Sequence, residues 1–297
     1  MQVAECIVTN EVQPTPRYAA AWSSIITGED VKERLLHSAL LGLTLRSQLL
    51  FDVTALHGLV LLYGPPGTGK TTLARGLAHE LSGLVTGGRV RLIEVNPHGL
   101  MSVEHGQSQQ KVFELLCDHI PLLADDRMPT VVVLDEVESM TIARSAASLS
   151  ANPADVHRAT DAVLEALDQV ARQHPHLITV ATSNFTESLD EAFVSRADAS
   201  ILVPLPNIEA VEAIIARTLS DFSEVYPRLK ELSVASGLRK VAEAAEGTDG
   251  RQARKLVTEA MATRRETVLD PNTLTVEDLL HAASSLSREK VRSHGTT

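Results

Sequence analysis

The fold is decided by one short run of the sequence, Gly64-Pro65-Pro66-Gly67-Thr68-Gly69-Lys70-Thr71. It matches the phosphate-binding loop pattern Gly-x-x-x-x-Gly-Lys-Ser/Thr. The apolar residues 59–63 before it predict a strand, and Leu73, Leu77 and Leu81 after it share one face of a predicted helix. In such a loop the backbone N–H groups and the positive end of the helix face phosphate oxygens. The sequence therefore predicts a nucleotide site. A chance glycine turn is a poor alternative because loop, strand and helix coincide.

The loop assigns roles to individual side chains. We expect Lys70 to reach the β- and γ-phosphates and the Thr71 hydroxyl to bind Mg²⁺. The predicted cofactors are thus ATP and Mg²⁺. The residues predicted to contact the nucleotide are those of the loop and the one that follows it: Gly64, Pro65, Pro66, Gly67, Thr68, Gly69, Lys70, Thr71 and Thr72.

Two carboxylates follow a second apolar run. Residues 131–134 predict a buried strand, and Asp135 and Glu136 come directly after it. Ligands of open α/β sheets bind at the carboxyl ends of strands, which would place both acids beside the phosphate loop. We expect Asp135 to hold Mg²⁺, mostly through water, and Glu136 to act as general base on the attacking water. The alternative is a solvated pair of acids at a strand end.

The next predicted strand, residues 177–181, runs into Thr182-Ser183-Asn184. A neutral amide at this edge can orient the attacking water without adding charge beside the γ-phosphate. An Asn at a strand end is otherwise most often a turn former. Because this strand follows the Asp135 strand in the sequence, we assign Asn184 to the site.

The order of elements predicts an α/β fold. Five apolar runs, at 59–63, 90–95, 131–134, 177–181 and 201–203, alternate with amphipathic helices and predict a parallel five-stranded sheet covered on both faces. From Asn207 onward only helical periodicity is present. The predicted organisation is an extended N-terminal arm over residues 1–24, a large α/β domain over residues 25–206 and a helical domain over residues 207–297.

Composition narrows the function classes. The 297 residues have a formal net charge of −11, which disfavours a chain built to bind nucleic acid. No run of 18 apolar residues is present, so we expect no membrane span. The first residues lack the basic and apolar regions of a secretory signal. Cys6 and Cys117 alone cannot form a disulfide framework. We expect a cytoplasmic protein.

The order of motifs resembles that of AAA+ ATPases, from about residue 25 to residue 290. Within that superfamily, several short strings are most similar to the pachytene-checkpoint remodellers, a family of hexamers that convert HORMA-domain proteins between conformations. These strings are Leu92–Asn96, Leu134–Ser139, Thr182–Asn184, Ala192–Asp198 and Gly250–Leu256. The resemblance implies a P-loop AAA+ fold in which the helical domain is a lid.

The resemblance also implies roles for three arginines. Arg196 matches an arginine finger, which would reach the γ-phosphate bound by the neighbouring subunit, so that hydrolysis would require a ring. The alternative for a lone loop arginine is a surface ion pair. Arg251 resembles a lid arginine that touches the nucleotide. Arg254 lies one turn further on, and the sequence does not separate the two roles.

The sequence departs from this family in two places. The expected pore loop, with Val103, Glu104 and His105, lacks the family's aromatic residue, so Val103 and His105 would have to grip the substrate. For His105 an exposed loop histidine is an equal alternative. In addition, some 25 residues precede the predicted ATPase core, too few for the recruitment domain of eukaryotic members. We expect substrate recruitment to differ.

The resemblance implies an ATP-driven homo-hexamer that partly unfolds a HORMA-domain protein and so disassembles its signalling complex. Bacterial relatives act beside HORMA proteins in anti-phage defence, and the compact architecture suits that setting. Two other functions are weighed against it. A DNA-linked AAA+ ATPase, such as a clamp or helicase loader, is disfavoured by the acidic charge. A nucleotide-gated scaffold without turnover is disfavoured because Lys70, Asp135, Glu136 and Asn184 are all present.

Overall fold

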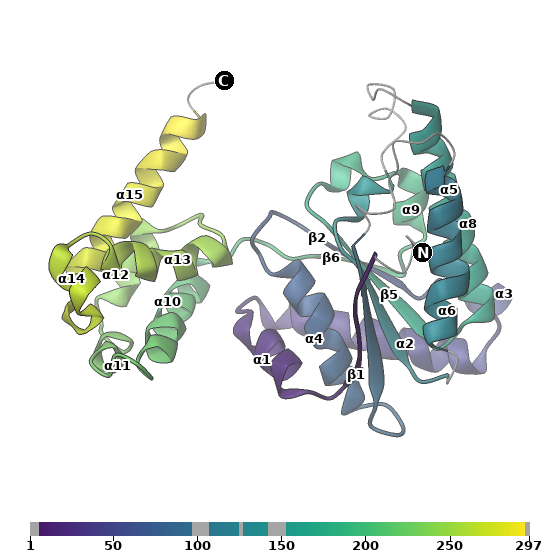
Figure 1. The fold of residues 1–297 in the computed structure, drawn as a ribbon, viewed down its shortest axis with the longest axis horizontal. Helices are drawn as coiled ribbons and strands as arrows, with labels where there is room; N and C mark the ends of the chain where they lie inside the picture. Colours follow the sequence, from purple (N-terminus) through teal and green to yellow (C-terminus); the bar gives the residue numbers. More distant parts are fainter. Residues whose placement is uncertain (1–5, 97–106, 125–126, 142–152, 295–297) are drawn as a thin grey trace. The chain divides into compact units, whose positions relative to one another are not determined.

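The computed structural model describes residues 6–96, 107–124, 127–141 and 153–294 (Figure 1). It divides into two compact units. The first comprises Met1–Gly64 and Lys70–Val203, and the second comprises Pro65–Gly69 and Pro204–Thr297. The boundary at Pro204 lies close to the division predicted at residue 207. The grouping of residues 65–69 with the helical unit was not predicted.

The first unit is built on a six-stranded sheet in the order β1-β3-β4-β5-β2-β6. The strands are β1 (Ile7–Gln13), β2 (Leu59–Tyr63), β3 (Val90–Val95), β4 (Thr130–Leu134), β5 (Leu177–Ser183) and β6 (Ala199–Leu202). β2 to β6 pair in parallel and coincide with the five predicted strands. The α/β fold is therefore confirmed, but the predicted strand count is one too low.

The sixth strand is β1, which pairs antiparallel with the edge of β3. Residues 7–13 are thus part of the sheet, and their prediction as an extended arm was wrong. Residues 7–13 lack a clear apolar alternation because polar side chains make contacts with β3. The Thr9 hydroxyl donates to Glu94 Oε2 at 3.4 Å, and Arg91 Nη1 donates to Asn10 Oδ1 at 3.1 Å.

Another part of the predicted arm is helix α1 (Pro16–Ser24). Pro16 lies in the first turn, where the fixed φ suits a helix and the missing N–H costs nothing. Tyr18 and Trp22 are buried and anchor the helix against α4 (Lys70–Ser82). Residues 16–24 therefore belong to the core of the first unit.

Gly76 provides a test of this packing. A Cβ at Gly76 would lie 2.8 Å from Trp22 Cβ and 3.1 Å from the Trp22 backbone N and Cα. We expect Gly76→Leu to overpack the α1–α4 contact and cost about 1–3 kcal/mol of stability, measured as a lowered thermal midpoint. Gly83→Leu is the control, because its nearest neighbour would lie at 3.6 Å. Equal midpoints for the two variants would contradict the placement of α1.

Helices cover both faces of the sheet. Successive side chains of β2 point to opposite faces and are buried on both. Val60 and Leu62 face the core formed with α1, α2 (Glu29–Gln48) and α4, whereas Leu59 and Leu61 face the core formed with the helices on the other side. Those helices are α5 (Gln107–Phe113), the π-helical segment η3 (Glu114–His119), α6 (Ile120–Leu123) and α8 (Pro153–Gln173). The short elements are α3 (Phe51–Thr54), η4 (Val137–Ser139), η5 (Thr186–Ser188) and α9 (Glu191–Ser195).

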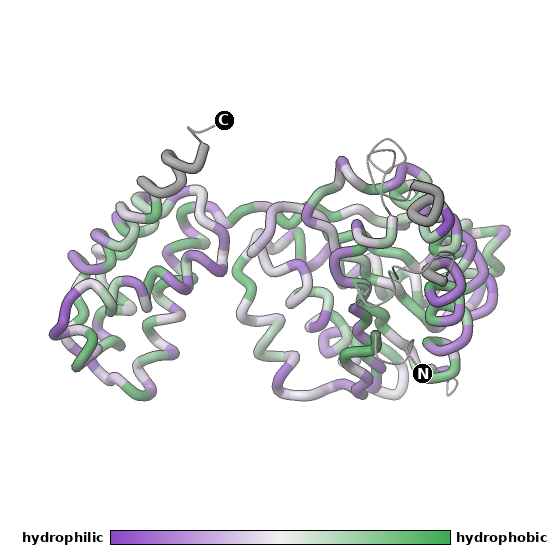
Figure 2. The backbone as a smooth tube through the Cα atoms, turned by 45° about the horizontal axis from the view of Figure 1, so that its top comes forward, coloured by the Kyte–Doolittle hydropathy of each residue, from purple (hydrophilic) through white to green (hydrophobic). Residues whose placement is uncertain are grey.

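The second unit contains only helices beyond residue 204. They are α10 (Ile208–Phe222), α11 (Leu229–Leu232), α12 (Leu238–Ala244), α13 (Gly250–Met261), α14 (Arg265–Leu269), η6 (Pro271–Thr273) and α15 (Val276–His294). A capping box begins α15: Thr275 N donates to Asp278 Oδ2 at 3.0 Å, and Asp278 N donates to Thr275 Oγ1 at 3.3 Å. The hydropathy colouring alternates along these helices, as one-sided burial requires (Figure 2).

Among the helices formed by the described residues, none combines the length and the apolar character needed to cross a bilayer.

Candidate nucleotide-binding site

The phosphate loop follows β2 at the carboxyl edge of the sheet. Gly64, Gly67 and Gly69 have φ values of 140°, 78° and 96°, a region that favours glycine. A Cβ at Gly64 would also lie 2.4 Å from the Val203 carbonyl oxygen. The loop then turns into α4 at Lys70, so the predicted strand–loop–helix order is present.

The register of the sheet brings the predicted site residues together. β4 pairs with β5 so that Leu134 lies opposite Ala181, which places the next residues, Asp135 and Thr182, side by side. β2 pairs with β5 so that Tyr63 lies opposite Ser183, and Gly64 N donates to the Ser183 carbonyl oxygen at 3.3 Å. Three strand ends therefore converge on one place.

Lys70 is buried beside this edge, with 5% of its surface exposed. Its Nζ donates to the Gly64 carbonyl oxygen and to Asn184 Oδ1, each at 2.8 Å. Burial lowers the pKa of Lys70, and the carboxylates of Glu138, Asp135 and Glu136 act in the opposite direction. The Lys70 ammonium group thus lies beside the phosphate loop. It donates to two neutral oxygens, which phosphate oxygens can replace as acceptors.

Asp135 receives two hydroxyl donors on one oxygen. Thr71 Oγ1 and Thr182 Oγ1 both donate to Asp135 Oδ1 at 2.6 Å. The Thr71 and Asp135 oxygens are hard ligands of the kind that Mg²⁺ prefers, so these residues fit the ion. No cluster of three or more His, Cys, Asp or Glu side chains suited to a metal occurs among the described residues.

Glu136 and Asn184 face each other across the site. Glu136 has a left-handed backbone with φ 52°, and its side chain is exposed. Such a conformation costs about 1–3 kcal/mol and is concentrated at functional sites. Asn184 Nδ2 donates to Glu136 Oε1 at 3.4 Å, while its Oδ1 accepts from Lys70. The amide therefore links the cation to the exposed carboxylate.

Two residues of the site were not singled out from the sequence. Thr182 bridges the pair of acids, because its hydroxyl donates to Asp135 and accepts from the Glu136 backbone N–H at 3.0 Å. Glu138 Oε1 accepts from the Asn184 backbone N–H at 3.2 Å. Only their positions in the sequence could have pointed to these two residues. Thr182 lies at the end of the Asn184 strand, and Glu138 lies two residues after Glu136.

Thr182→Val tests the bridge. The valine keeps the shape but removes the hydroxyl, so Asp135 loses a donor and the Glu136 N–H loses its acceptor. We expect ATP turnover to fall about 10- to 100-fold, the usual effect of losing a supporting hydrogen bond around a metal site. Steady-state phosphate release measures it. Thr182→Ser retains the hydroxyl and should stay near wild type; an equal loss in both variants would assign the effect to packing.

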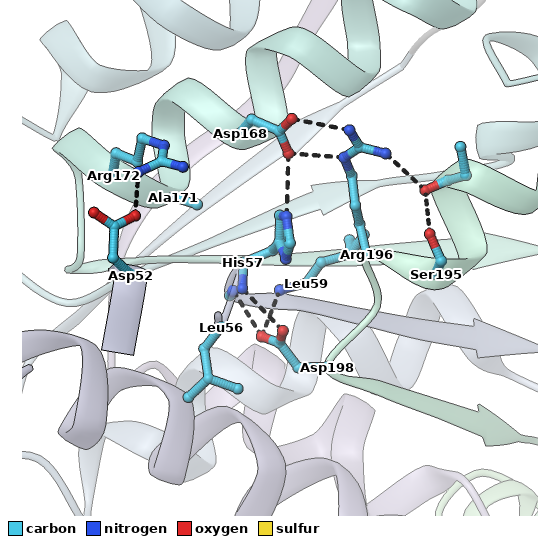
Figure 3. Close-up of polar contacts among 12 residues, drawn as sticks. Asp52, Leu56, His57, Leu59, Asp168, Ala171, Arg172, Ser195, Arg196 and Asp198 are labelled. Carbon is cyan, nitrogen blue, oxygen red and sulfur yellow. Dashed lines mark hydrogen bonds and ion pairs between the residues drawn. The ribbon is translucent and has the colours of Figure 1, made fainter. Parts of the chain in front are cut away.

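Arg196 lies apart from these residues. It follows α9, and Asp198, two residues later, accepts from the backbone N–H groups of Gly58 and Leu59 at 2.7 and 3.2 Å, at the start of β2. The phosphate loop begins at the other end of that strand. Arg196 instead pairs with Asp168 of α8, through Nε to Oδ1 at 2.7 Å and Nη2 to Oδ2 at 2.9 Å (Figure 3).

The remaining predicted residues stand as follows. Pro65, Pro66 and Thr68 lie in the loop, where the Thr68 hydroxyl donates to the Pro65 carbonyl oxygen at 3.0 Å, and Thr72 lies in the first turn of α4. Arg251 and Arg254 are exposed on α13 of the second unit. Val103, Glu104 and His105 lie outside the described residues.

Several known proteins are similar to this chain in sequence and in fold. The family described as "ATPase family associated with various cellular activities (AAA)" matches residues 60–205. CD-NTase-associated protein 6 of Pseudomonas aeruginosa is 44% identical over 261 residues, which cover 88% of this chain and 86% of that protein. The pachytene checkpoint protein 2 homologue of Rattus norvegicus is 34% identical over 300 residues, covering 92% of this chain and 67% of the relative.

Among solved structures, the E. coli MS115-1 HORMA:CdnC:Trip13 complex contains a chain that matches with a TM-score of 0.74 and 16% identity, covering 95% of this chain and 96% of that one. At this identity the likeness establishes the fold alone. The similarity to CD-NTase-associated protein 6 extends over most of both chains. The chain therefore belongs to the AAA ATPase family that contains CD-NTase-associated protein 6 and the pachytene checkpoint protein 2 homologues.

Proposed function

We propose that this chain hydrolyses ATP to ADP and phosphate with Mg²⁺ as cofactor, and that Glu136 is the general base. The contact of Asn184 with both Lys70 and Glu136 carries the proposal. Lys70 binds the β- and γ-phosphates, and Asn184 and Glu136 hold a water at the γ-phosphate, where Glu136 takes its proton.

When bound, Mg²⁺ would supply positive charge that neutralises the charge developing on the phosphates. Thr71 and Asp135 would hold it. Thr182 keeps the Asp135 carboxylate in place, and Glu138 fixes the backbone at Asn184. Each of these residues acts by positioning a group, as expected for phosphoryl transfer, where catalysis rests on orientation and electrostatics. Arg251 and Arg254 of the lid are proposed to contact the same nucleotide.

We further propose that the chain works as a homo-hexamer in which Arg196 completes the site of the neighbouring subunit. The position of Arg196 supports this assignment. It lies at the start of β2, whereas the chain's own phosphate loop follows the end of that strand. Five strand residues at about 3.3 Å each separate the two ends, and this distance from the chain's own phosphate loop supports a role for Arg196 in the site of another chain.

The proposed substrate is a HORMA-domain protein. The relatives support this choice: one is named for its association with a CD-NTase, and one solved structure joins HORMA, CdnC and Trip13 chains. We propose that the ring partly unfolds the HORMA protein and so disassembles its signalling complex in anti-phage defence. Val103, Glu104 and His105 are proposed to grip the substrate in the pore.

The test is to incubate a HORMA–nucleotidyltransferase complex with this protein and ATP, and to follow its dissociation by size-exclusion chromatography. We expect release with the wild-type chain and retention with Glu136→Gln. A non-hydrolysable ATP analogue serves as the second control. Release at equal rates by both chains, or no binding of HORMA protein, would overturn the proposed substrate.

A further inference from the structure

The loop that carries Arg196 is fixed at both ends. Asp198 Oδ1 accepts from His57 N at 2.9 Å, and Asp198 Oδ2 accepts from Gly58 N and Leu59 N. Three backbone donors on one carboxylate tie this residue to the start of β2. At the other end of the loop, the Arg196 guanidinium binds Asp168. The two ion-pair distances, 2.7 and 2.9 Å, are those of a bidentate pair, which sets the plane of the guanidinium as well as its position.

The Asp168 carboxylate is oriented in turn. His57 Nε2 lies 3.1 Å from Asp168 Oδ1, and the His57 ring packs edge-on against Phe51 with 5.1 Å between ring centroids. Hydrogen bonds from Arg196 lower the pKa of Asp168, while burial acts in the opposite direction. Asp168 therefore stays ionised at neutral pH. A chain of contacts from Phe51 through His57 to Asp168 holds one edge of the guanidinium in place. Figure 3 shows the part of this chain from His57 to Arg196.

This arrangement leaves some N–H donors of the Arg196 guanidinium available for a further hydrogen bond. An arginine has five N–H donors. Nε and Nη2 each donate once to Asp168, and Nη1 donates to the Ala192 carbonyl oxygen at 2.9 Å. One N–H on each terminal nitrogen has no partner in the described parts of the chain. The side chain keeps 23% of its surface exposed, so the guanidinium is not closed off from an anion outside the subunit.

We propose that Asp168 is a positioning residue for ATP hydrolysis: it holds Arg196 in the orientation from which its free N–H groups meet the γ-phosphate in the neighbouring subunit. The inference rests on the proposed role of Arg196 as a finger in trans. Fixing the guanidinium before the phosphate binds matters, because an unrestrained arginine side chain would lose rotamer freedom on binding. A misplacement of about 1 Å can cost about a hundredfold in rate.

The test uses Asp168→Asn, which keeps the size of the side chain but removes the charge and one acceptor oxygen. We expect turnover to fall at least about tenfold and up to about a hundredfold, with ATP affinity and ring size unchanged. Asp168→Glu retains a carboxylate and should recover part of the activity. Asp52→Asn is the matched control, because it removes one carboxylate from a more exposed ion pair, with Arg172, at the same end of the sheet.

Mixing experiments locate the defect. Asp168→Asn chains mixed with Lys70→Ala chains should regain activity, because the first supply intact phosphate loops and the second supply intact fingers. Asp168→Asn mixed with Arg196→Ala should gain none, since both lack a competent finger. Rescue by Arg196→Ala but not by Lys70→Ala would place the defect in the chain's own site and overturn the inference.

The inference and the proposed function fail in different ways. Normal or raised turnover in Asp168→Asn, with turnover lost in Arg196→Ala, would overturn the positioning role and leave the finger intact. Normal turnover in Arg196→Ala would overturn the finger itself and the inference with it. Should Asp168→Asn fail to assemble, Asp168→Glu decides: partial turnover that Lys70→Ala chains restore and Arg196→Ala chains do not supports the positioning role, whereas unchanged turnover or the reverse pattern of rescue contradicts it.

Discussion

Arg196→Ala is expected to lower ATP turnover by roughly 10³-fold or more while nucleotide affinity stays near that of the wild type. The reason is that the proposed finger would stabilise charge on the γ-phosphate only in the transition state. Loss of folding is a poor explanation, because partly exposed ion pairs such as Arg196–Asp168 contribute about 0–1 kcal/mol. Steady-state phosphate release and equilibrium binding of a fluorescent ATP analogue measure the two quantities.

The trans assignment of Arg196 has its own control. Mixed with Lys70→Ala chains, the Arg196→Ala chains should recover activity, since one variant supplies the phosphate loop and the other the arginine. Native mass spectrometry establishes that mixed rings have formed. Mixed rings that show no recovery would count against a finger in trans.

Glu136→Gln is expected to lower turnover by at least about a hundredfold and to leave ATP affinity unchanged. The amide has the same shape and can adopt the same left-handed backbone, so only the ability to take a proton is lost. Lys70→Ala is the contrasting variant and should lose ATP binding, because Nζ is the cation of the loop. Single-turnover measurements separate the chemical step from product release. Hydrolysis by Glu136→Gln at a near wild-type rate would show that another group is the base.

The sequence predicted the parts of the site that depend on local pattern. The phosphate loop and Asp135 could be recognised because each is a short motif next to an apolar strand, and the carboxyl edge of a parallel sheet then brings them together. Asn184 needed one further step, the expectation that its strand lies beside the Asp135 strand. β4 and β5 are indeed neighbours. Its role in catalysis stays a prediction.

Other features depended on contacts between distant residues. The Arg196–Asp168 pair joins positions 28 residues apart, and neither side chain carries a signal of the pairing. Thr182 was within a recognised string, but a threonine at a strand end does not show that its hydroxyl bridges two acids. β1 was missed because a polar edge strand lacks the apolar alternation that identifies half-buried strands. α1 was missed because Pro16 suits both an extended chain and a first helical turn.

β1 also has a consequence for how the protein behaves in solution. Without it, β3 would present a row of unpaired N–H and C=O groups along a strand containing Leu92 and Ile93, the kind of edge on which other chains nucleate aggregates. β1 occupies that edge and offers Thr9, Asn10 and Glu11 in its place. At the opposite edge β6 has only four residues, which gives another chain little to pair with. The N-terminal segment thus contributes to colloidal stability, a property that no assay of ATP turnover would reveal.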